Sequence, residues 1–152
     1  MKKLIPLAFL LLSFAPIPAT SATMAKIAMF KVELVYTEAA AAKLKETGDK
    51  LQIDVYYLGA PIAGDKTELN DEGQIALGDD STILFQPGPA EFGGNEFDAS
   101  LLDHIIDHEA HVLINVNSSK LDKNVIDCDV FEDKVSVAAK EPVKLQCDVA
   151  AN

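Results

Sequence analysis

Short segments in which apolar and polar residues alternate constrain the fold of this chain more than any other feature. In 28–36 and 51–57 every second residue is apolar. Side chains alternate between the two faces of a strand, so this pattern is typical of a strand with one buried face. Further segments of this kind, separated by turn-forming residues, lie at 112–116, 126–130, 134–138 and 143–149. The chain is therefore predicted to be mainly β, an antiparallel β-sandwich of about seven short strands with one or two short helices.

Helices and turns are predicted where the alternation stops. Glu38–Thr47 is rich in alanine and lysine, and it is followed by Gly48, a residue type that commonly ends a helix. Asp98–His108 begins with a suitable N-terminal cap, and a helix there has an apolar face made of Leu101, Leu102, Ile105 and Ile106. The Asn-Asp-Glu-Gly run at 70–73 predicts a turn that leads into a strand at 74–77. The Gly-Asp-Asp run at 78–80 predicts another turn, before a strand at 82–86.

The first 22 residues predict export. Lys2 and Lys3 precede an apolar run, and the small residues that follow end in Thr20-Ser21-Ala22, which resembles a signal-peptidase site. The run is too short to span a bilayer, so we interpret 1–22 as a cleaved signal peptide and expect no membrane insertion afterwards. We interpret 23–152 as a single domain, periplasmic or secreted from a bacterium. The alternative is an N-terminal helix that is retained, either buried or at a membrane interface.

The negative charge of the chain limits the classes of partner that it is expected to bind. The formal charge of −11 becomes −13 when Lys2 and Lys3 leave with the signal, and all basic residues are lysines. Nucleic acids and anionic membranes are disfavoured, because both require clustered positive charge. Basic proteins or metal cations suit this electric field better. The alternative is that the acidity only keeps an exported domain in solution.

The two cysteines predict a disulfide. Cys128 and Cys147 each share the parity of the apolar residues in their predicted strands, so both sulfurs should face one core. In an oxidising compartment such a pair is expected to be bridged, closing a loop of about 20 residues and stabilising the fold by roughly 3 kcal/mol. The alternatives are a two-thiol metal site and a redox pair, although the close Cys-x-x-Cys spacing of such sites is missing.

The three histidines form the one cluster that could carry chemistry. In a helix over 98–108, His104 and His108 stand four residues apart on the polar side, where one cation could bridge them. Imidazole suits Zn²⁺ and Cu²⁺, and Asp107 and His111 are the candidates for further ligands.

Two alternatives to the metal site remain open. The histidines could lie on a solvated helix face, or they could form a patch that charges near pH 6. If the helix ends near His108, His111 begins the next strand on the face opposite to Val112 and points away from any metal.

One segment resembles a known family. Val55-Tyr56-Tyr57-Leu58-Gly59-Ala60-Pro61-Ile62-Ala63-Gly64, followed by Asp71-Glu72-Gly73-Gln74-Ile75-Ala76-Leu77, is similar to part of the transthyretin-like and carboxypeptidase-regulatory-like β-sandwich domains. In those domains a strand meets a Gly-x-Pro turn, and an acidic-Gly turn opens the next strand. Too few residues lie between Gly64 and Asp71 for the full strand of that pattern. The resemblance implies a sandwich and a non-catalytic accessory role, and it carries over no site residue.

Catalytic motifs are missing from the sequence. It contains no Gly-x-Ser-x-Gly elbow and no phosphate-binding glycine loop, and 108–111 lacks the His-Glu-x-x-His spacing. We therefore interpret the chain as a non-enzymatic, exported binding or accessory protein whose partner is a protein or envelope component, with a basic one favoured by charge. Tyr56 could mark the contact surface, although the alternation of Tyr56 and Tyr57 with Ile53 and Val55 favours core and strand packing. The alternatives are a periplasmic Zn²⁺ or Cu²⁺ protein using His104 and His108, and an enzyme whose site is assembled from distant residues.

Overall fold

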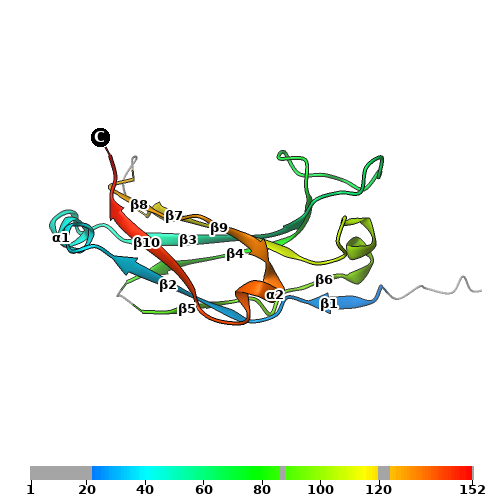
Figure 1. Cartoon of the computed structure of the whole chain (residues 1–152), viewed down its shortest axis with the longest axis horizontal. Coiled ribbons are helices and arrows are strands. Elements are labelled where there is room, and N and C mark those ends of the chain that lie inside the picture. Colours follow the sequence, from blue (N-terminus) through cyan, green and yellow to red (C-terminus); the bar gives the residue numbers. More distant parts are fainter. Residues whose placement is uncertain (1–21, 86–87, 120–123, 152) are drawn as a thin grey trace, which may run out of the picture.

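The architecture is a mainly β, sandwich-like fold, as the alternating segments predict (Figure 1). A computed structural model describes residues 22–85, 88–119 and 124–151, so the predicted signal peptide lies outside the described residues except for Ala22. The strands are β1 (Met24–Lys26), β2 (Phe30–Tyr36), β3 (Leu51–Gly59), β4 (Ile75–Leu84), β5 (Ala90–Phe92), β6 (Glu96–Asp98), β7 (His111–Ser118), β8 (Ile126–Cys128), β9 (Phe131–Lys134) and β10 (Val143–Val149). The helices are α1 (Glu38–Thr47), the 3₁₀ helix η1 (Ala99–His104) and α2 (Val135–Ala138). None of the described helices is long and apolar enough to cross a membrane.

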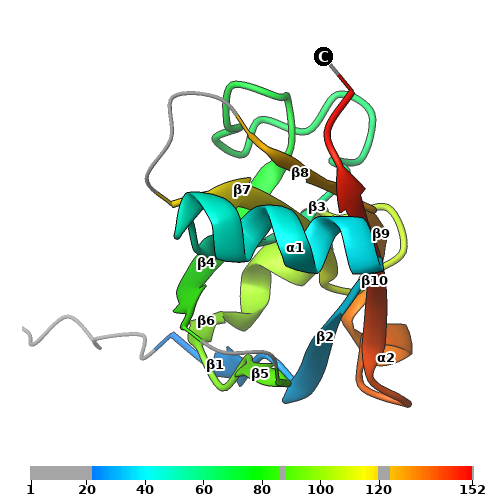
Figure 2. The same cartoon turned by 90° about the vertical axis from the view of Figure 1, so that its left-hand side faces the viewer.

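Two four-stranded sheets form the two layers of the fold. One has the strand order β5-β2-β10-β8 and the other β4-β3-β7-β9, while β1 and β6 form a separate two-stranded sheet. Figure 2 shows the layers end-on, with α1 lying across the near end of both. The pairing is antiparallel except between β2 and β10, which run parallel with Val32 beside Val143. This parallel pair departs from the all-antiparallel prediction.

The core confirms which alternate residues of the strands were predicted to be buried. Phe30, Val32 and Leu34 of β2 are buried, as are all the apolar residues of the same parity in β3 from Leu51 to Tyr57. The ring of Phe30 meets that of Tyr57 edge to face, with 6.4 Å between centroids. Because these side chains come from different sheets, their burial holds the two layers together, at roughly 1.5–3 kcal/mol for each large apolar side chain.

Helix α1 begins and ends as its sequence predicts. The Thr37 hydroxyl accepts a hydrogen bond from the Ala40 N–H at 3.1 Å, and Gly48 ends the helix in the left-handed conformation with φ of 64°. The Thr37 hydroxyl also donates to Asp148 Oδ1 at 2.8 Å, which fixes the helix to β10. The Thr37 side chain therefore caps the helix and also attaches it to β10.

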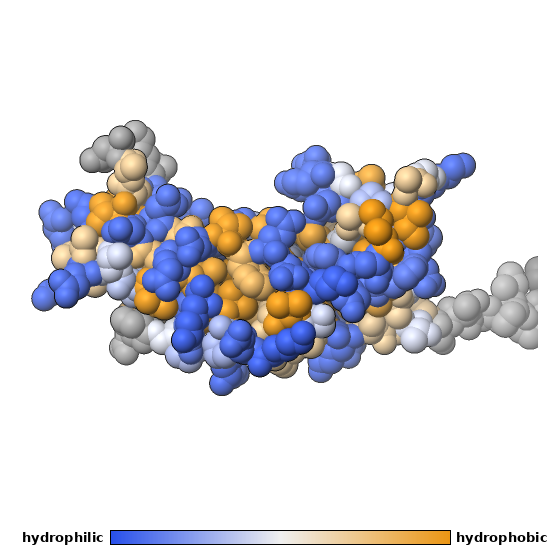
Figure 3. All heavy atoms as spheres, viewed as in Figure 1, coloured by the Kyte–Doolittle hydropathy of each residue, from blue (hydrophilic) through white to orange (hydrophobic). Residues whose placement is uncertain are grey.

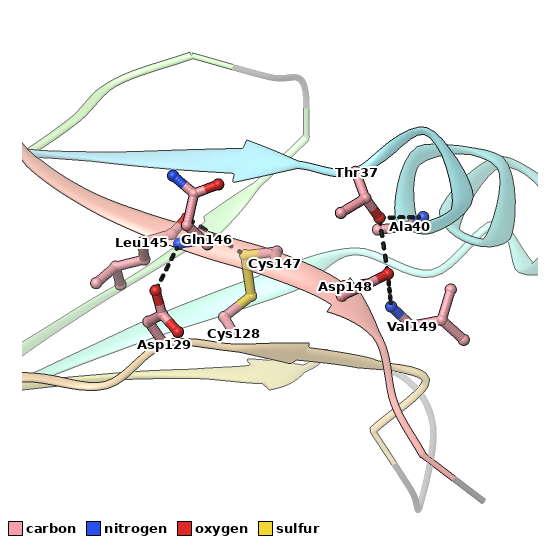
Figure 4. Close-up of a disulfide and its surroundings, with 9 residues drawn as sticks. All are labelled: Thr37, Ala40, Cys128, Asp129, Leu145, Gln146, Cys147, Asp148 and Val149. Atoms are coloured by element: carbon pink, nitrogen blue, oxygen red, sulfur yellow. Dashed lines mark hydrogen bonds between the residues drawn. A yellow bond between two sulfur atoms is a disulfide. The ribbon is translucent and has the colours of Figure 1, made fainter.

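The predicted disulfide is present. Cys128 and Cys147 face each other directly across β8 and β10, and their sulfurs are bonded (Figure 4). Cys147 is fully buried, and the partly buried Cys128 packs against the core. The adjacent backbone pairing includes a hydrogen bond from the Asp129 N–H to the Gln146 carbonyl at 2.8 Å. The alternation of each cysteine in step with the apolar residues of its strand thus predicted both the bond and its place in the core.

The predicted turn at 78–80 is wrong, because β4 runs unbroken from Ile75 to Leu84. A bulge beside Tyr57 and Leu58 of β3 absorbs one extra residue, and Gly78 takes a φ of 139°. Since β4 is an edge strand, the aspartates can stay hydrated without ending it.

The chain's own side chains occupy part of the open edge of β4. The Asn95 amide donates to the Asp79 carbonyl at 3.2 Å, and the Ser81 N–H donates to the Asp80 carboxylate at 2.9 Å. Bonds of this kind protect an edge strand from pairing with another chain.

Two other predicted strands also differ. The segment predicted at 126–130 ends as β8 at Cys128, and the chain then crosses to the other sheet as β9. The segment predicted at 134–138 is the helix α2, in which Val135 and Ala138 are buried. Two apolar residues three apart fit one helical turn as well as a strand, and so short a segment cannot separate the two periods.

Candidate functional site

The predicted helix over 98–108 is not formed. Asp98 caps a shorter 3₁₀ helix, η1, by accepting a hydrogen bond from the Ser100 N–H at 3.0 Å. Ile105 is then extended and fully buried, whereas Ile106 is 64% exposed. The reason is non-local: the His104 carbonyl accepts from the Ile62 N–H, and the Ile106 N–H donates to the Ala60 carbonyl, both at about 3 Å. These bonds to a distant segment replace those of a continuing helix.

The predicted metal ligands have separate partners. His104 Nδ1 lies 2.8 Å from Asp65 Oδ2, and His108 Nδ1 donates to the Leu102 carbonyl at 2.9 Å. His111 Nε2 lies 2.9 Å from Asp107 Oδ2, so that only these two of the four predicted ligands contact each other. Throughout the described part of the chain, no group of three or more His, Cys, Asp or Glu side chains is placed to hold a metal ion.

The Asp107–His111 pair belongs to a four-residue ionic cluster, which we call the β7–β9 cluster. Lys134 Nζ lies 3.0 Å from Asp107 Oδ2 and 2.9 Å from Glu109 Oε2. His111 and Lys134 are directly opposite in the β7–β9 register. Hydrogen bonds from His111 and Lys134 hold the pKa of the Asp107 carboxyl well below its usual range, while Glu109 and Asp107 raise the pKa of Lys134. The cluster joins the turn before β7 to the end of β9.

The Asp65–His104 pair anchors the long connection between β3 and β4, residues 60–74, which we call the overhanging loop. Asp65 Oδ1 also accepts a hydrogen bond from the Thr67 N–H at 2.7 Å. Bonds from His104 and then Thr67 hold the pKa of the Asp65 carboxyl well below its usual range. A backbone bridge between Pro61 and Ile105 completes the attachment. In Figure 1 the loop rises above the end of its sheet, beside η1.

These two lowered pKa values predict an acid-sensitive fold. A carboxyl with a lowered pKa in the folded state stabilises it above the unfolded pKa, near 4, and this stabilisation is lost as the pH falls toward the folded value. We expect the free energy of unfolding to decrease below about pH 5. Asp65→Asn/Asp107→Asn should be less stable at pH 7 and should lose less on acidification. Urea denaturation at pH 7, 5 and 3.5 measures this. Asp103→Asn, at an exposed position, is the control. An equal loss of unfolding free energy between pH 7 and pH 3.5 in all three proteins would contradict the prediction.

A pocket of about 380 Å³ lies on the outer face of the β4-β3-β7-β9 sheet, beneath the overhanging loop. Its floor is apolar. Tyr56 of β3 stands directly opposite Leu113 of β7, and Leu58 lies along the same face of β3. The Tyr56 side chain is 44% exposed, so its ring is accessible to a partner. The pocket thus offers an aromatic and aliphatic surface on a rigid sheet.

The wall of the pocket is built by a tight turn of the overhanging loop. Asn70 Oδ1 accepts hydrogen bonds from the N–H groups of Glu72 at 3.1 Å and Gln74 at 2.8 Å. The Asn70 carbonyl accepts from the Gly73 N–H, and Gly73 has a φ of 78°, which glycine adopts without strain. The acidic-Gly turn of the resembling segment is therefore present at 70–73, as its sequence predicts, and it places Glu72 and Gln74 at the pocket.

Carboxylates dominate the pocket's electrostatics. Glu132 of β9 is directly opposite Leu113, and Asp79 of β4 is directly opposite Tyr56, on the same face of the sheet. Neither Glu72 nor Glu132 forms an ion pair or side-chain hydrogen bond with any other described residue. The residues that line the pocket are Tyr56, Leu58, Asn70, Glu72, Gln74, Leu113, Asn115 and Glu132, and none of them is basic. The site can bind a cationic group that has an apolar stem.

Sequence reasoning identified only part of this pocket. The single residue of the pocket that it singled out as a contact residue was Tyr56, an aromatic residue on the solvent-facing side of β3. Leu113 and Glu132 join Tyr56 through strand register alone. The resembling segment, 55–77, supplies the end of β3, the overhanging loop and the start of β4. Comparison of the chain with family models, curated proteins and solved structures finds no match.

Proposed function

We propose that this protein is an exported, non-enzymatic binding module that holds a basic segment of a partner protein against the outer face of the β4-β3-β7-β9 sheet. The observation that carries the proposal is the pocket beneath the overhanging loop, in which Glu72 and Glu132 surround an apolar floor without a basic neighbour in the lining. A carboxylate gains most from an incoming cation where no internal cation already pairs with it. The formal charge of −11 also steers basic partners toward the protein.

Several observations support the accessory role and the compartment. The Cys128–Cys147 disulfide is of the kind that persists in oxidising compartments, in agreement with the signal peptide expected at 1–22. The resemblance of 55–77 to transthyretin-like domains, which implies an accessory role, falls on the segment that forms the pocket wall. Sites for recognition are commonly carried by loops that a rigid sheet positions.

The proposal predicts that a basic peptide binds through the pocket. The probe is a fluorescent decapeptide in which arginine and lysine alternate with glycine, titrated with the exported protein in a fluorescence anisotropy experiment at 0.15 M salt. Glu72→Gln/Glu132→Gln should weaken its binding about tenfold, because each lost charge contact is worth up to about 1 kcal/mol at a partly exposed site.

A matched variant distinguishes binding at this pocket from attraction by the overall negative charge. Glu38→Gln/Glu96→Gln removes the same two charges at exposed positions outside the pocket lining, so it should change binding less than twofold. Equal weakening in the two double variants would mean that only net charge attracts the peptide, and the proposed site would be rejected. Undetectable binding to the unmodified protein would reject the proposed function itself.

A further inference from the structure

We infer that the group seated in this pocket is an arginine side chain of the partner, in preference to lysine. The inference rests on the proposed function, and it concerns the same site. Its first support is the placement of the two carboxylates: Glu72 stands on the overhanging loop, whereas Glu132 stands on the edge strand β9. The row formed by Tyr56 and Leu113 lies across β3 and β7. A cation above this row therefore meets acceptors that come from two separate walls.

The chemistry of the two cations differs at such a site. An arginine guanidinium is planar, carries five N–H donors and can bond to carboxylates on different sides while one face lies on an aromatic ring. A lysine ammonium is a compact, strongly hydrated charge with three donors. Besides Glu72 and Glu132, the lining includes Gln74 and Asn115, whose side-chain amides each contain one acceptor oxygen. A guanidinium lying on Tyr56 can use more of these acceptors at once.

The size of the pocket supports the larger head group. A volume of about 380 Å³ is that of roughly a dozen water molecules in the liquid. Lysine also has an apolar stem, of four carbons, but its ammonium group is smaller than a guanidinium group and fills less of this space. A guanidinium with its three-carbon stem covers the floor made by Tyr56 and Leu113 and removes apolar surface from water.

The composition of the chain points the same way. All of its 13 basic residues are lysines, and none is arginine. A pocket that accepted lysine readily would be open to the lysines of neighbouring copies, among them the exposed Lys45 and Lys144. A pocket that prefers arginine discriminates against this self-association, because no copy of the chain carries the preferred group. Figure 3 shows one face of the molecule, on which hydrophilic residues surround several hydrophobic patches.

Three short peptides test the inference. They are acetyl-Gly-Gly-Xaa-Gly-Gly-amide, in which Xaa is arginine, lysine or citrulline, the last a neutral analogue of arginine. Each is titrated into the isotopically labelled protein, and the Leu113 methyl and Asn115 side-chain amide resonances are followed by NMR. The arginine peptide should shift both resonances and bind about fivefold more tightly than the lysine peptide, the size expected of one exposed cation–π contact. The citrulline peptide should cause no saturable shift.

Two variants locate the source of the preference. Tyr56→Leu keeps the floor apolar but removes the ring, so it should reduce the arginine preference to less than twofold. Glu132→Gln should weaken the binding of both the arginine peptide and the lysine peptide. Equal binding of arginine and lysine, lost in Glu132→Gln, would overturn the inference and leave the proposed function intact. If the basic decapeptide binds but no short peptide shifts Leu113 or Asn115, the pocket is not the site and the inference is also overturned. If neither the decapeptide nor the short peptides bind, the proposed function fails with it.

Discussion

Replacing Cys128 and Cys147 together by alanine is expected to lower the free energy of unfolding by about 3 kcal/mol. The bond closes a loop with a sequence separation of 19, and on the chain-entropy model such a loop restricts the unfolded chain by about that amount. The fold makes the loss local as well as global. Strand β8 is only three residues long, and β10 is its one strand partner in the described part of the chain. Without the disulfide, β8 is the strand expected to open first.

Denaturant unfolding of the double variant measures this cost. The reference is the unmodified protein in reductant, which keeps both sulfur atoms but removes the bond. It should lose nearly as much stability as the double variant, since constraint and not packing dominates. Hydrogen exchange of the Cys128→Ala/Cys147→Ala variant tests the local effect, and the amides of β8 should exchange faster than those of β3. If the reduced protein keeps its stability within about 0.5 kcal/mol, the chain-entropy account does not hold for this loop.

The features that could be predicted from sequence are those that local parity determines. The buried faces of β2 and β3 and the placement of both cysteines follow from alternation, because every second side chain of a strand shares a face. Helix α1 follows from its composition and from the glycine at its end. In each case the information lies within about ten consecutive residues.

The 98–108 segment shows where local reasoning fails. Its apolar spacing fits a helix, yet Ile105 is buried beneath Gly59 while Ile106 faces solvent. The hydrogen bonds that decide this come from the overhanging loop, about 40 residues earlier in the chain. The same loop supplies Asp65, which draws His104 away from the other histidines. A pattern within one segment carries no information about such a partner.

The pocket was beyond local prediction for a related reason. Tyr56, Leu113 and Glu132 lie on three strands, and only the pairing of β3, β7 and β9 brings them into one row. Strand order and register depend on how the whole core packs. The predicted turn at 70–73 was correct, but its position above the sheet depends on the attachment of the loop to η1.

The close packing of Gly59 against Ile105 makes Gly59→Ala a destabilising substitution. A Cβ atom at position 59 would lie 2.3 Å from Ile105 Cδ1, and within 3 Å of both Cγ atoms of the same side chain. Because Ile105 is fully buried, its side chain cannot move aside without disturbing the core. We expect a loss of about 1–3 kcal/mol in the free energy of unfolding, typical of overpacking. Gly88→Ala is the matched control, since an added Cβ there meets no atom within 4 Å.

A double-mutant cycle ties this contact to the pocket. If the clash with Ile105 is the cause, Gly59→Ala should cost at least 1 kcal/mol less in an Ile105→Ala background than in the unmodified protein. The displaced Ile105 should also shift the bonded 60–62 segment, so the Gly59→Ala variant should bind the basic decapeptide more weakly while still folded at 10 °C. Additive costs would show that the two positions do not interact. Unchanged peptide binding would show that the overhanging loop keeps its position without this contact, and that the pocket wall is fixed by the Asp65–His104 pair and the Asn70 turn alone.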